Sequence, residues 1–402
     1  MKMLFLGAAR HQVPAIEAAL LQGFDVYTAD NAPGNPGHRL AREAFDVSAA
    51  DVDAVAALAG RLKVDGVLGY ASEVCARTAA RVAWRLGLPG SPPDAVEALS
   101  FKDAFREITQ STGLQPLTWH SFGKADRDPA AEWARSLRTS VVVKPVDSSG
   151  GRGVTVGATL EKFPEAFDQA LAASRQGRVI VEEQVVPVMG QFGGDGWMEH
   201  GRLKFLHCFD NETLPAPDNG AAIWEMFPSR ISHELQEVMR LHLEALLLAC
   251  GYTCGPINFD GCFLESGCPF VFEIAPRSGG NFIPQQVQRQ MGVDLTTACV
   301  LAAVDKGFQL PVPQRSAPGF HATWVVHTRR AGKLRSVTWA RELDPFLAEH
   351  VPYVGPGAMV RPFATSGDAL GMLLLKFPSR ETMQEVMARL PELCHINLEP
   401  TL

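Results

Sequence analysis

Lys144 lies where a β-branched run meets a glycine-rich loop, an arrangement typical of a phosphate-binding site. The run 141–143 predicts a buried strand, Pro145 ends it, and the following loop holds Asp, Ser, Gly and Arg152 before a second apolar run at 154–156. Glycine lets backbone amides approach a polyanion, and lysine and arginine supply positive charge. The pattern predicts a strand–loop–strand unit for a nucleotide triphosphate. It is not a Walker A loop, because Lys144 precedes the glycines.

Alone, a lysine at a strand end is more often a solvated surface charge, and only the glycine loop favours ligand binding here. A second chemical signal is the pair Asp260 and Glu273. They lie in two alternating apolar segments, 258–264 and 269–274, separated by the turn-like residues 265–267. A β-hairpin can bring both carboxylates to one face, and such oxygens suit Mg²⁺ beside nucleotide phosphates. An exposed charged hairpin is the alternative, but the apolar neighbours favour walled-in carboxylates.

The elements that position these residues begin with alternating strands and helices in residues 1–93. Strands are predicted at 3–6, 24–28 and 66–69, and helices at 13–22, 51–63 and 72–86, the last capped by Ser72. Parallel sheets bind ligands at the carboxyl ends of their strands, where Arg10, His11 and Glu73 stand. These three are therefore candidate substrate contacts, with ordinary surface charge as the equal alternative. The loop after the first strand is not GxGxxG, so a dinucleotide site has little support.

The remaining chain divides at proline-rich residues 89–93. A helix is predicted from Lys102 to Gly113, then the Lys144 unit, a helix at 161–173 broken near Pro164, and a strand at 179–186. Residues 190–310 predict an antiparallel sheet with long helices, the clearest of which covers 233–250. From 311 the chain is β-rich and ends in a helix at 381–390.

Composition restricts the classes of protein. The 402 residues carry a net charge of −7 without a Lys/Arg run, which argues against nucleic acid as a partner. No run approaches the roughly 18 apolar residues of a membrane span, and the N-terminus does not have the pattern of a secretory signal. The eight cysteines form no CxxC pair, which argues against zinc. Reduced cysteines in a cytoplasmic protein are the simplest interpretation.

Taken in order, Lys102, the Lys144 loop, the strand at 182–185 and the segment from Asp260 to Asn281 resemble the ATP-grasp superfamily, particularly its carboxylate–amine ligases. The resemblance covers roughly residues 1–310. It implies a multidomain α/β and α+β fold: a Rossmann-like N-terminal domain, a two-lobed ATP-grasp domain and a small β-rich C-terminal region. The expected boundaries are 1–93, 94–189 for the small lobe, 190–310 for the large lobe, and 311–402.

The resemblance also implies a ligand set, with ATP and Mg²⁺ as cofactors. Asp260 and Glu273 are the implied metal ligands, and Arg277, Lys144 and Asn281 the implied catalytic residues. The implied nucleotide contacts are Lys102, Lys144, Ser148, Ser149, Gly150, Gly151, Gly153, Glu182, Glu183, Gln184, Val185 and Gln191. Glu182 would accept the adenine amino group, and the backbone at 184–185 would contact the ring edge.

Two positions depart from the pattern of the superfamily. Gln191 stands nearest to where such ligases often have a ribose-binding Glu, and Ala275 stands where an Asn metal ligand is usual, unless Asn281 or water substitutes. Arg230 falls, with Asn211, Glu225 and Ser229, in a segment that often lines the acceptor pocket. A proline-rich surface loop is the equal alternative for that segment.

The implied reaction activates a small carboxylic acid as an acylphosphate and joins it to an amine, with amino acids among the candidates. A homodimer is left open, and neither nucleic acid nor membrane is expected as a partner. Two alternatives are also left open: a carboxylase or carbamoyl-phosphate-type enzyme using bicarbonate, and a nucleotide-binding regulatory protein with weak turnover. Ala275 and Gln191 favour the latter, whereas the retained Lys144, Asp260, Glu273 and Arg277 count against it.

Overall fold

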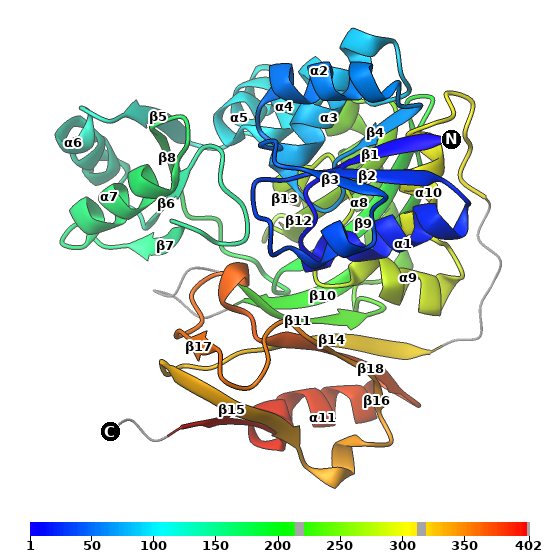
Figure 1. The fold of residues 1–402 in the computed structure, drawn as a ribbon. Helices are drawn as coiled ribbons and strands as arrows, with labels where there is room; N and C mark the ends of the chain where they lie inside the picture. Colours follow the sequence, from blue (N-terminus) through cyan, green and yellow to red (C-terminus); the bar gives the residue numbers. More distant parts are fainter. Residues whose placement is uncertain (214–220, 312–318, 400–402) are drawn as a thin grey trace.

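The computed structural model describes residues 1–213, 221–311 and 319–399, and its strands form four sheets (Figure 1). The first sheet is parallel, in the order β3-β2-β1-β4, as the alternation of residues 1–93 predicts. The short edge strand β3 was not predicted, because three residues carry no readable periodicity. The strands are β1 (Lys2–Leu6), β2 (Asp25–Ala29), β3 (Glu43–Phe45) and β4 (Gly66–Leu68).

Helices and 3-10 turns flank this sheet, and the predicted cap is confirmed. Ser72 Oγ accepts a hydrogen bond from the amide of Cys75 at 3.5 Å, so α3 begins where expected. The elements are η1 (Arg10–Gln12), α1 (Val13–Leu21), η2 (Pro36–Arg39), α2 (Val52–Leu62) and α3 (Glu73–Leu86).

The predicted boundary at 89–93 leads into a helix that the sequence did not reveal. This helix, α4 (Pro93–Ser100), precedes α5 (Lys102–Ser111), which begins at Lys102 as expected. Beyond them, an antiparallel sheet of order β5-β8-β6-β7 stands apart from the body of the molecule, and α6 and α7 belong to this small lobe (Figure 1). Its elements are β5 (Trp119–Gly123), α6 (Arg127–Leu137), β6 (Val141–Pro145), β7 (Thr155–Ala158), α7 (Phe163–Ala173) and β8 (Arg178–Glu183).

Pro164 does not break a helix, contrary to expectation. It stands in the first turn of α7, where an amide has no helical partner to lose, so the helix begins there instead.

The largest sheet has the order β13-β12-β9-β10-β11-β14-β18-β16 and is antiparallel throughout. Its last three strands come from residues 319–399. The expected boundary near 311 therefore does not separate two sheets. The strands are β9 (Phe192–Glu199), β10 (Arg202–Thr213), β11 (Ala222–Phe227), β12 (Gly255–Phe263), β13 (Pro269–Ala275), β14 (Phe320–Val326), β16 (Leu347–Pro352) and β18 (Gly371–Phe377).

The two faces of this sheet have different coverings. The α8 helix (His233–Ala249) packs its leucines on one face, against Ile257 and Phe259. On the other face Trp197, Phe209 and Phe227 form a core with β1, α9 (Ile283–Met291) and α10 (Leu295–Ala302). Because side chains alternate along a strand, polar residues in register with this second set share the face directed at the N-terminal sheet.

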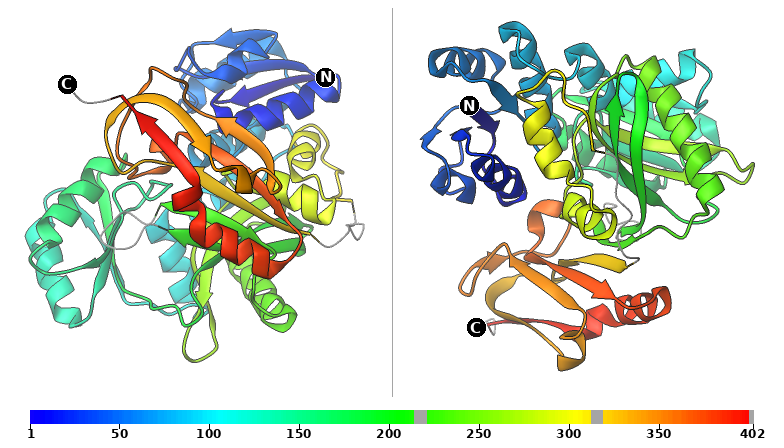
Figure 2. Two further views of the ribbon diagram at one scale, coloured as in Figure 1. Left: turned by 90° about the horizontal axis from the view of Figure 1, so that it is seen from below. Right: turned by 90° about the vertical axis from the view of Figure 1, so that its right-hand side faces the viewer.

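The C-terminal segment adds a small sheet, β17-β15-β19, and a helix that lies over the outer surface of β14 and β18 (Figure 2). These elements are β15 (Gly332–Trp339), η3 (Arg341–Leu343), β17 (Met359–Val360), η4 (Ser366–Asp368), α11 (Arg380–Leu393) and β19 (Cys394–Leu398). No helix in the described ranges combines the length and apolarity needed to cross a bilayer.

Candidate functional site

The predicted hairpin is present as β12–β13, and Asp260 is paired directly with Glu273 in it. Burial, followed by the charge of Glu273, raises the pKa of Asp260 to about 7. Two carboxylates side by side repel each other, although the side chain of Glu273 is 41% exposed to solvent, and a divalent cation would relieve that repulsion. The donor set therefore fits Mg²⁺. Among the described residues no third His, Cys, Asp or Glu completes a cluster, so substrate oxygens and water would supply the other ligands.

Lys102 connects the glycine loop to this carboxylate pair. Its Nζ donates to the carbonyl oxygen of Ser148 at 2.7 Å and lies 3.4 Å from Glu273 Oε2. The loop makes its bend with three glycines at positive φ, namely Gly150, Gly151 and Gly153. A Cβ at Gly153 would lie 2.6 Å from that of Ala173, so a larger residue there meets α7 as well as backbone strain. Two basic side chains thus contact this loop, since Arg152 Nε also donates to the carbonyl oxygen of Ser149 at 3.3 Å.

Lys144 does not reach the carboxylate pair but is buried against Glu182. Lys144 Nζ lies 2.7 Å from Glu182 Oε2, and Arg106 Nε lies 2.9 Å from Oε1. Burial lowers the pKa of Lys144, partly offset by Glu182. A carboxylate has about four lone-pair sites, so an adenine amino group can still donate to Glu182. Arg106 was missed from the sequence, where it reads as an ordinary helix residue.

Two of the backbone amides that follow Glu182, near the expected contact with the adenine ring, already donate hydrogen bonds within the protein. The amide of Gln184 donates to Ser140, and that of Glu183 donates to Thr118. Val185 is the remaining candidate amide, since no hydrogen bond from it is found among the described residues. Gln191 comes directly before β9.

Arg277 ties the large sheet to the N-terminal domain. Its Nε donates to Glu73 Oε1 at 3.1 Å, Nη2 contacts the same oxygen, and Nη1 donates to Asn258 Oδ1 at 3.2 Å. Burial alone would raise the pKa of Glu73, but Arg277 outweighs it and the pKa falls to about 2. Desolvation, followed by the charge of Arg277, lowers the pKa of His11, while Glu73 acts in the opposite direction, so His11 lies within electrostatic range of both. Glu73 and His11, two of the three residues expected at this strand end, thus lie near Arg277, which the strand-end argument did not include.

The segment 277–281 is fixed by Asp195, which sequence reasoning missed. This fully buried carboxylate accepts from the amide of Gly279 at 3.0 Å and from Asn258 Nδ2 at 2.9 Å. Desolvation raises its pKa to about 6. In the sequence, Asp195 is a single acidic residue between glycines in an otherwise apolar strand, and this pattern could have indicated a buried carboxylate. Asp195 holds the backbone that positions Arg277.

Asn281 lies beside another buried carboxylate. Its Nδ2 donates to Glu225 Oε1 at 2.8 Å, and Thr323 Oγ1 contacts the other oxygen. Burial raises the pKa of Glu225 to about 7, against the effect of these two hydrogen bonds. Among the described residues no hydrogen bond joins the Asn281 side chain to Asp260 or Glu273, so its role as a substitute for the ligand missing at Ala275 stays a prediction. Ala275 itself pairs with Asn258, whose amide group already binds Arg277 and Asp195.

Two candidate substrate residues lie elsewhere. Arg230 Nη2 donates to the carbonyl oxygen of Met189 at 2.7 Å, which places it beside the segment after β8 rather than with Glu73. Arg10 Nη1 donates to the carbonyl oxygen of Pro352 at 2.9 Å and so links the N-terminal domain to β16. The structure therefore groups His11 and Glu73 with Arg277 and separates Arg230 from them.

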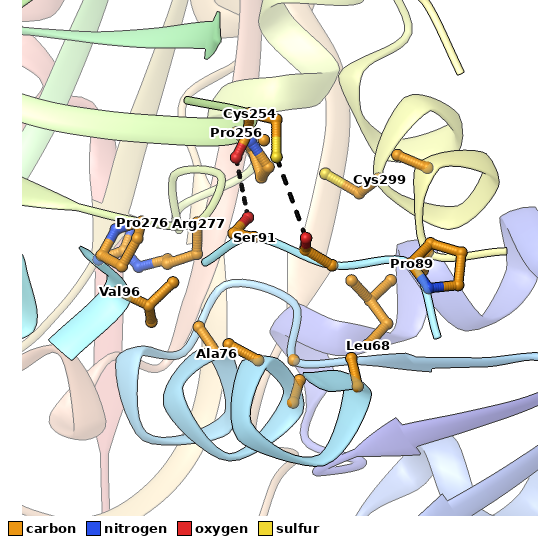
Figure 3. Close-up of a pocket in the computed structure, with 18 of the residues that line it drawn as sticks. Leu68, Ala76, Pro89, Ser91, Val96, Cys254, Pro256, Pro276, Arg277 and Cys299 are labelled. Atoms are coloured by element: carbon orange, nitrogen blue, oxygen red, sulfur yellow. Dashed lines mark hydrogen bonds between the residues drawn. The ribbon is translucent and has the colours of Figure 1, made fainter. Parts of the chain in front are cut away.

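A cavity of about 510 Å³ lies between the N-terminal sheet and the large sheet, with Arg277 at one end (Figure 3). Its lining is mostly apolar and includes Leu68, Ala76, Pro89 and Cys299. Ser91 Oγ donates to the carbonyl oxygen of Cys254 at 2.9 Å on the opposite wall. The cavity is therefore next to the contact between Arg277 and Glu73.

Comparison with known proteins agrees with this architecture. No family model matches the chain. An uncharacterized protein, y4rH of Sinorhizobium fredii, is 25% identical over 90% of this chain and 75% of its own length. A formate-dependent phosphoribosylglycinamide formyltransferase of Thioalkalivibrio sulfidiphilus is 27% identical, over 48% of this chain and 51% of its own length. The chain thus matches about half the length of that relative.

Solved structures resemble the whole chain at low identity. The L-amino acid ligase of Bacillus licheniformis matches with a TM-score of 0.79 and 18% identity, covering 99% of both chains. Phosphoribosylglycinamide synthetase of Anaerococcus prevotii matches with 0.75 and 17%, also over 99% of both. The biotin carboxylase domain of the Hydrogenobacter thermophilus 2-oxoglutarate carboxylase, solved with MgADP, matches with 0.75 and 16%, over 99% of this chain and 90% of its own. The structure therefore has the ATP-grasp fold that the sequence resemblance implied.

Proposed function

We propose that this protein is an ATP- and Mg²⁺-dependent ligase that activates a small carboxylic acid as an acylphosphate and joins it to an amine. The observation that carries the proposal is the position of Lys102. One ammonium group contacts both the glycine loop at Ser148 and the carboxylate pair at Glu273. A nucleotide bound by the loop would thus bring its terminal phosphate to the carboxylates. The ATP-grasp fold supports the same class of reaction.

The reaction would run in two steps. ATP would bind through Lys102, Lys144, the loop amides and the strand that holds Glu182. A substrate carboxylate oxygen would attack the γ-phosphorus, forming a P–O bond as the bond to ADP breaks, while Arg277 offsets the charge of the moving group. An amine would then attack the acyl carbon, forming the C–N bond and releasing phosphate. Asp260 and Glu273 would hold the magnesium, which would neutralise charge on the phosphate oxygens.

The proposal extends to organisation and partners. The divisions would be 1–93, 94–189, 190–310 and 311–402, with the last sharing the central sheet. The substrates would be a small acid and an amine, with amino acids as the first class to test, since one similar structure is an L-amino acid ligase. We propose a cytoplasmic enzyme acting without nucleic acid or membrane. A homodimer is included because one similar structure is described as a dimer.

Phosphate release from ATP, measured over a panel of acids with and without amines, tests the proposal. Release that requires an acid–amine pair is expected, and Lys144→Ala and Glu273→Gln are each expected to lower it more than about 100-fold. Lys124→Ala, an exposed lysine of the same lobe, is the matched control and should retain full rate. Normal turnover by Lys144→Ala or Glu273→Gln would refute the assigned site.

The same panel separates the two alternatives. Release with bicarbonate and no amine would favour the carboxylase. Nucleotide binding without release from any acid–amine pair would favour a regulatory binding protein.

A further inference from the structure

Glu225 is a buried carboxylate without a matching cation. Its side chain is 2% exposed, and its two oxygens accept hydrogen bonds from Asn281 and Thr323. No ion pair to Glu225 is found among the described residues, and residues 214–220 contain no Lys, Arg or His in the sequence. A buried charge is costly unless it is paired, so this position favours a positive group that the described protein does not supply.

Asn211 provides a second, independent sign of a missing donor. It pairs with Glu225 across β10 and β11, and directly opposite residues of such a pair hold their Cβ atoms about 5 Å apart. Asn211 Nδ2 donates to Asp260 Oδ1 at 2.8 Å, which turns its carbonyl oxygen away from Asp260. That oxygen, Oδ1, is buried and has no hydrogen-bond partner in the described structure. An acceptor without a donor, Asn211 Oδ1, thus lies next to a buried carboxylate without a cation, Glu225.

The position of this pair relative to the carboxylates fits one end of a small substrate. Asn211 reaches Asp260 diagonally across β9, where Asp260 pairs with Gly193 and a Cβ at that glycine would lie 3.0 Å from Asp260 Oδ1. Glu225 lies one strand further along the same face. A molecule with its carboxylate near Asp260 would therefore direct its remaining groups along this face towards Asn211 and then Glu225.

Partly buried apolar side chains lie around the same position. Ile223 is on the same face of β11 as Glu225, and Ile223, Phe282 and Tyr353 each pack against one buried cluster that includes Val325. Asn281 and Phe282 both have positive φ, at 49° and 59°, which is rare for residues with a Cβ. The hydrogen bond of Asn281 to Glu225 and the packing of Phe282 hold the backbone in this conformation.

We propose that Glu225 and Asn211 bind the ammonium group of the acid substrate, which is therefore an amino acid with an apolar side chain. The inference rests on the proposed ligase function and names the substrate class of the same site. The ammonium supplies the countercharge for Glu225 and a donor for Asn211 Oδ1. Ile223, Phe282 and Tyr353 contact the side chain. The amine that attacks in the second step is a different molecule or group, because a protonated amine held by a carboxylate is not nucleophilic.

Calorimetric binding to the full chain, with Mg²⁺ and a non-hydrolysable ATP analogue present, tests the subsite directly. The probes are the standard L-amino acids and, for each that binds, the matched acid lacking the amino group and the matched 2-hydroxy acid. An apolar amino acid is expected to bind at least about 100-fold tighter than its two analogues, as for removal of one member of a buried charge pair. Phosphate release is measured in parallel.

Substitutions of Glu225 test whether its carboxylate is the group that selects for the amino group of the substrate. Glu225→Gln is expected to weaken amino acid binding about 100-fold while leaving the binding of the desamino acid unchanged. Glu225→Asp, which retains the charge, should keep the preference for the amino acid at reduced affinity. Glu349→Gln, an exposed carboxylate of β16, is the control, and thermal unfolding of each variant confirms that it folds.

The outcomes separate this inference from the proposed function. Binding of amino acids that depends on Glu225 but causes no phosphate release would keep the subsite and refute the ligase. Phosphate release driven by acids without an amino group, at equal rates in Glu225→Gln, would keep the ligase and refute the subsite. Equal binding of an amino acid and its desamino analogue to the wild-type protein would also overturn the inference.

Discussion

Arg106, Glu182 and Lys144 form a buried cluster in which one carboxylate faces two cations. Their side chains are 1%, 5% and 9% exposed. Burial alone would raise the pKa of Glu182, but Arg106 and Lys144 outweigh it and hold the pKa at about 2, below the ordinary 4.5. At about 1.36 kcal/mol per pKa unit, this difference corresponds to about 3 kcal/mol of folding free energy.

Glu182→Gln keeps the shape of the side chain but leaves both cations buried without a counter-ion. Breaking a buried pair in this way costs about 3–5 kcal/mol, in line with the pKa argument. The free energy of unfolding at pH 7 is therefore expected to fall by about 3 kcal/mol. Urea unfolding followed by tryptophan fluorescence measures it, since Trp119 and Trp133 lie in the same lobe.

The dependence on pH gives a second check of the same cluster. Because the pKa of Glu182 is lower in the folded state, its contribution is fully present above about pH 4.5 and is lost as the pH falls towards 2. The unfolding free energies of the wild type and Glu182→Gln should therefore converge over this range. Glu161→Gln, an exposed residue of the same lobe, should stay within about 0.5 kcal/mol of the wild type. A loss below about 1 kcal/mol for Glu182→Gln, or a difference that does not change with pH, would refute the reasoning.

Three other positions give checks on stability and turnover. Burial lowers the pKa of His207 to about 4, below its ordinary 6.5. The free energy of unfolding should therefore fall by about 3 kcal/mol as the pH drops from 6.5 to 4 and the buried ring must become charged. His207→Gln should remove that loss, and parallel wild-type and variant curves would contradict it. Gly66→Ala places a Cβ against the carbonyl oxygen of Ala303 and should cost about 2 kcal/mol, whereas Gly60→Ala, in open space within α2, should gain about 0.5–1 kcal/mol; equal melting temperatures would be inconsistent with this packing. Arg277→Lys loses the two-nitrogen contact with Glu73 and should lower kcat about 100-fold with little change in KM for ATP; an unchanged kcat would remove Arg277 from the transfer step.

Features that are local in the sequence could be predicted well. The strands around Lys144 appear as β6 and β7, and the hairpin sets Asp260 opposite Glu273. In both, the partners are joined by a short connection, so periodicity and turn residues are sufficient to predict the pairing.

Long-range polar partners could not be predicted in this way. Glu182 meets Arg106 from a helix far earlier in the chain, and Glu225 meets Asn281 from a loop far later. A charged residue within an apolar strand, as in Trp224-Glu225-Met226, signals burial but does not reveal what compensates it. Likewise, the apolar runs of β14 and β18 predict strands but not the sheet they join.

The central sheet draws on strands from both halves of the chain, and this affects synthesis and truncation. A chain that ended near residue 311 would contain β11 but not β14, and so would expose an unpaired edge. Such edges template pairing with other chains and lead to aggregation. During translation the central sheet can therefore be completed only after β14, β16 and β18 have been synthesised, late in the chain. We expect variants truncated before β18 to aggregate, although the proposed nucleotide residues all precede that point.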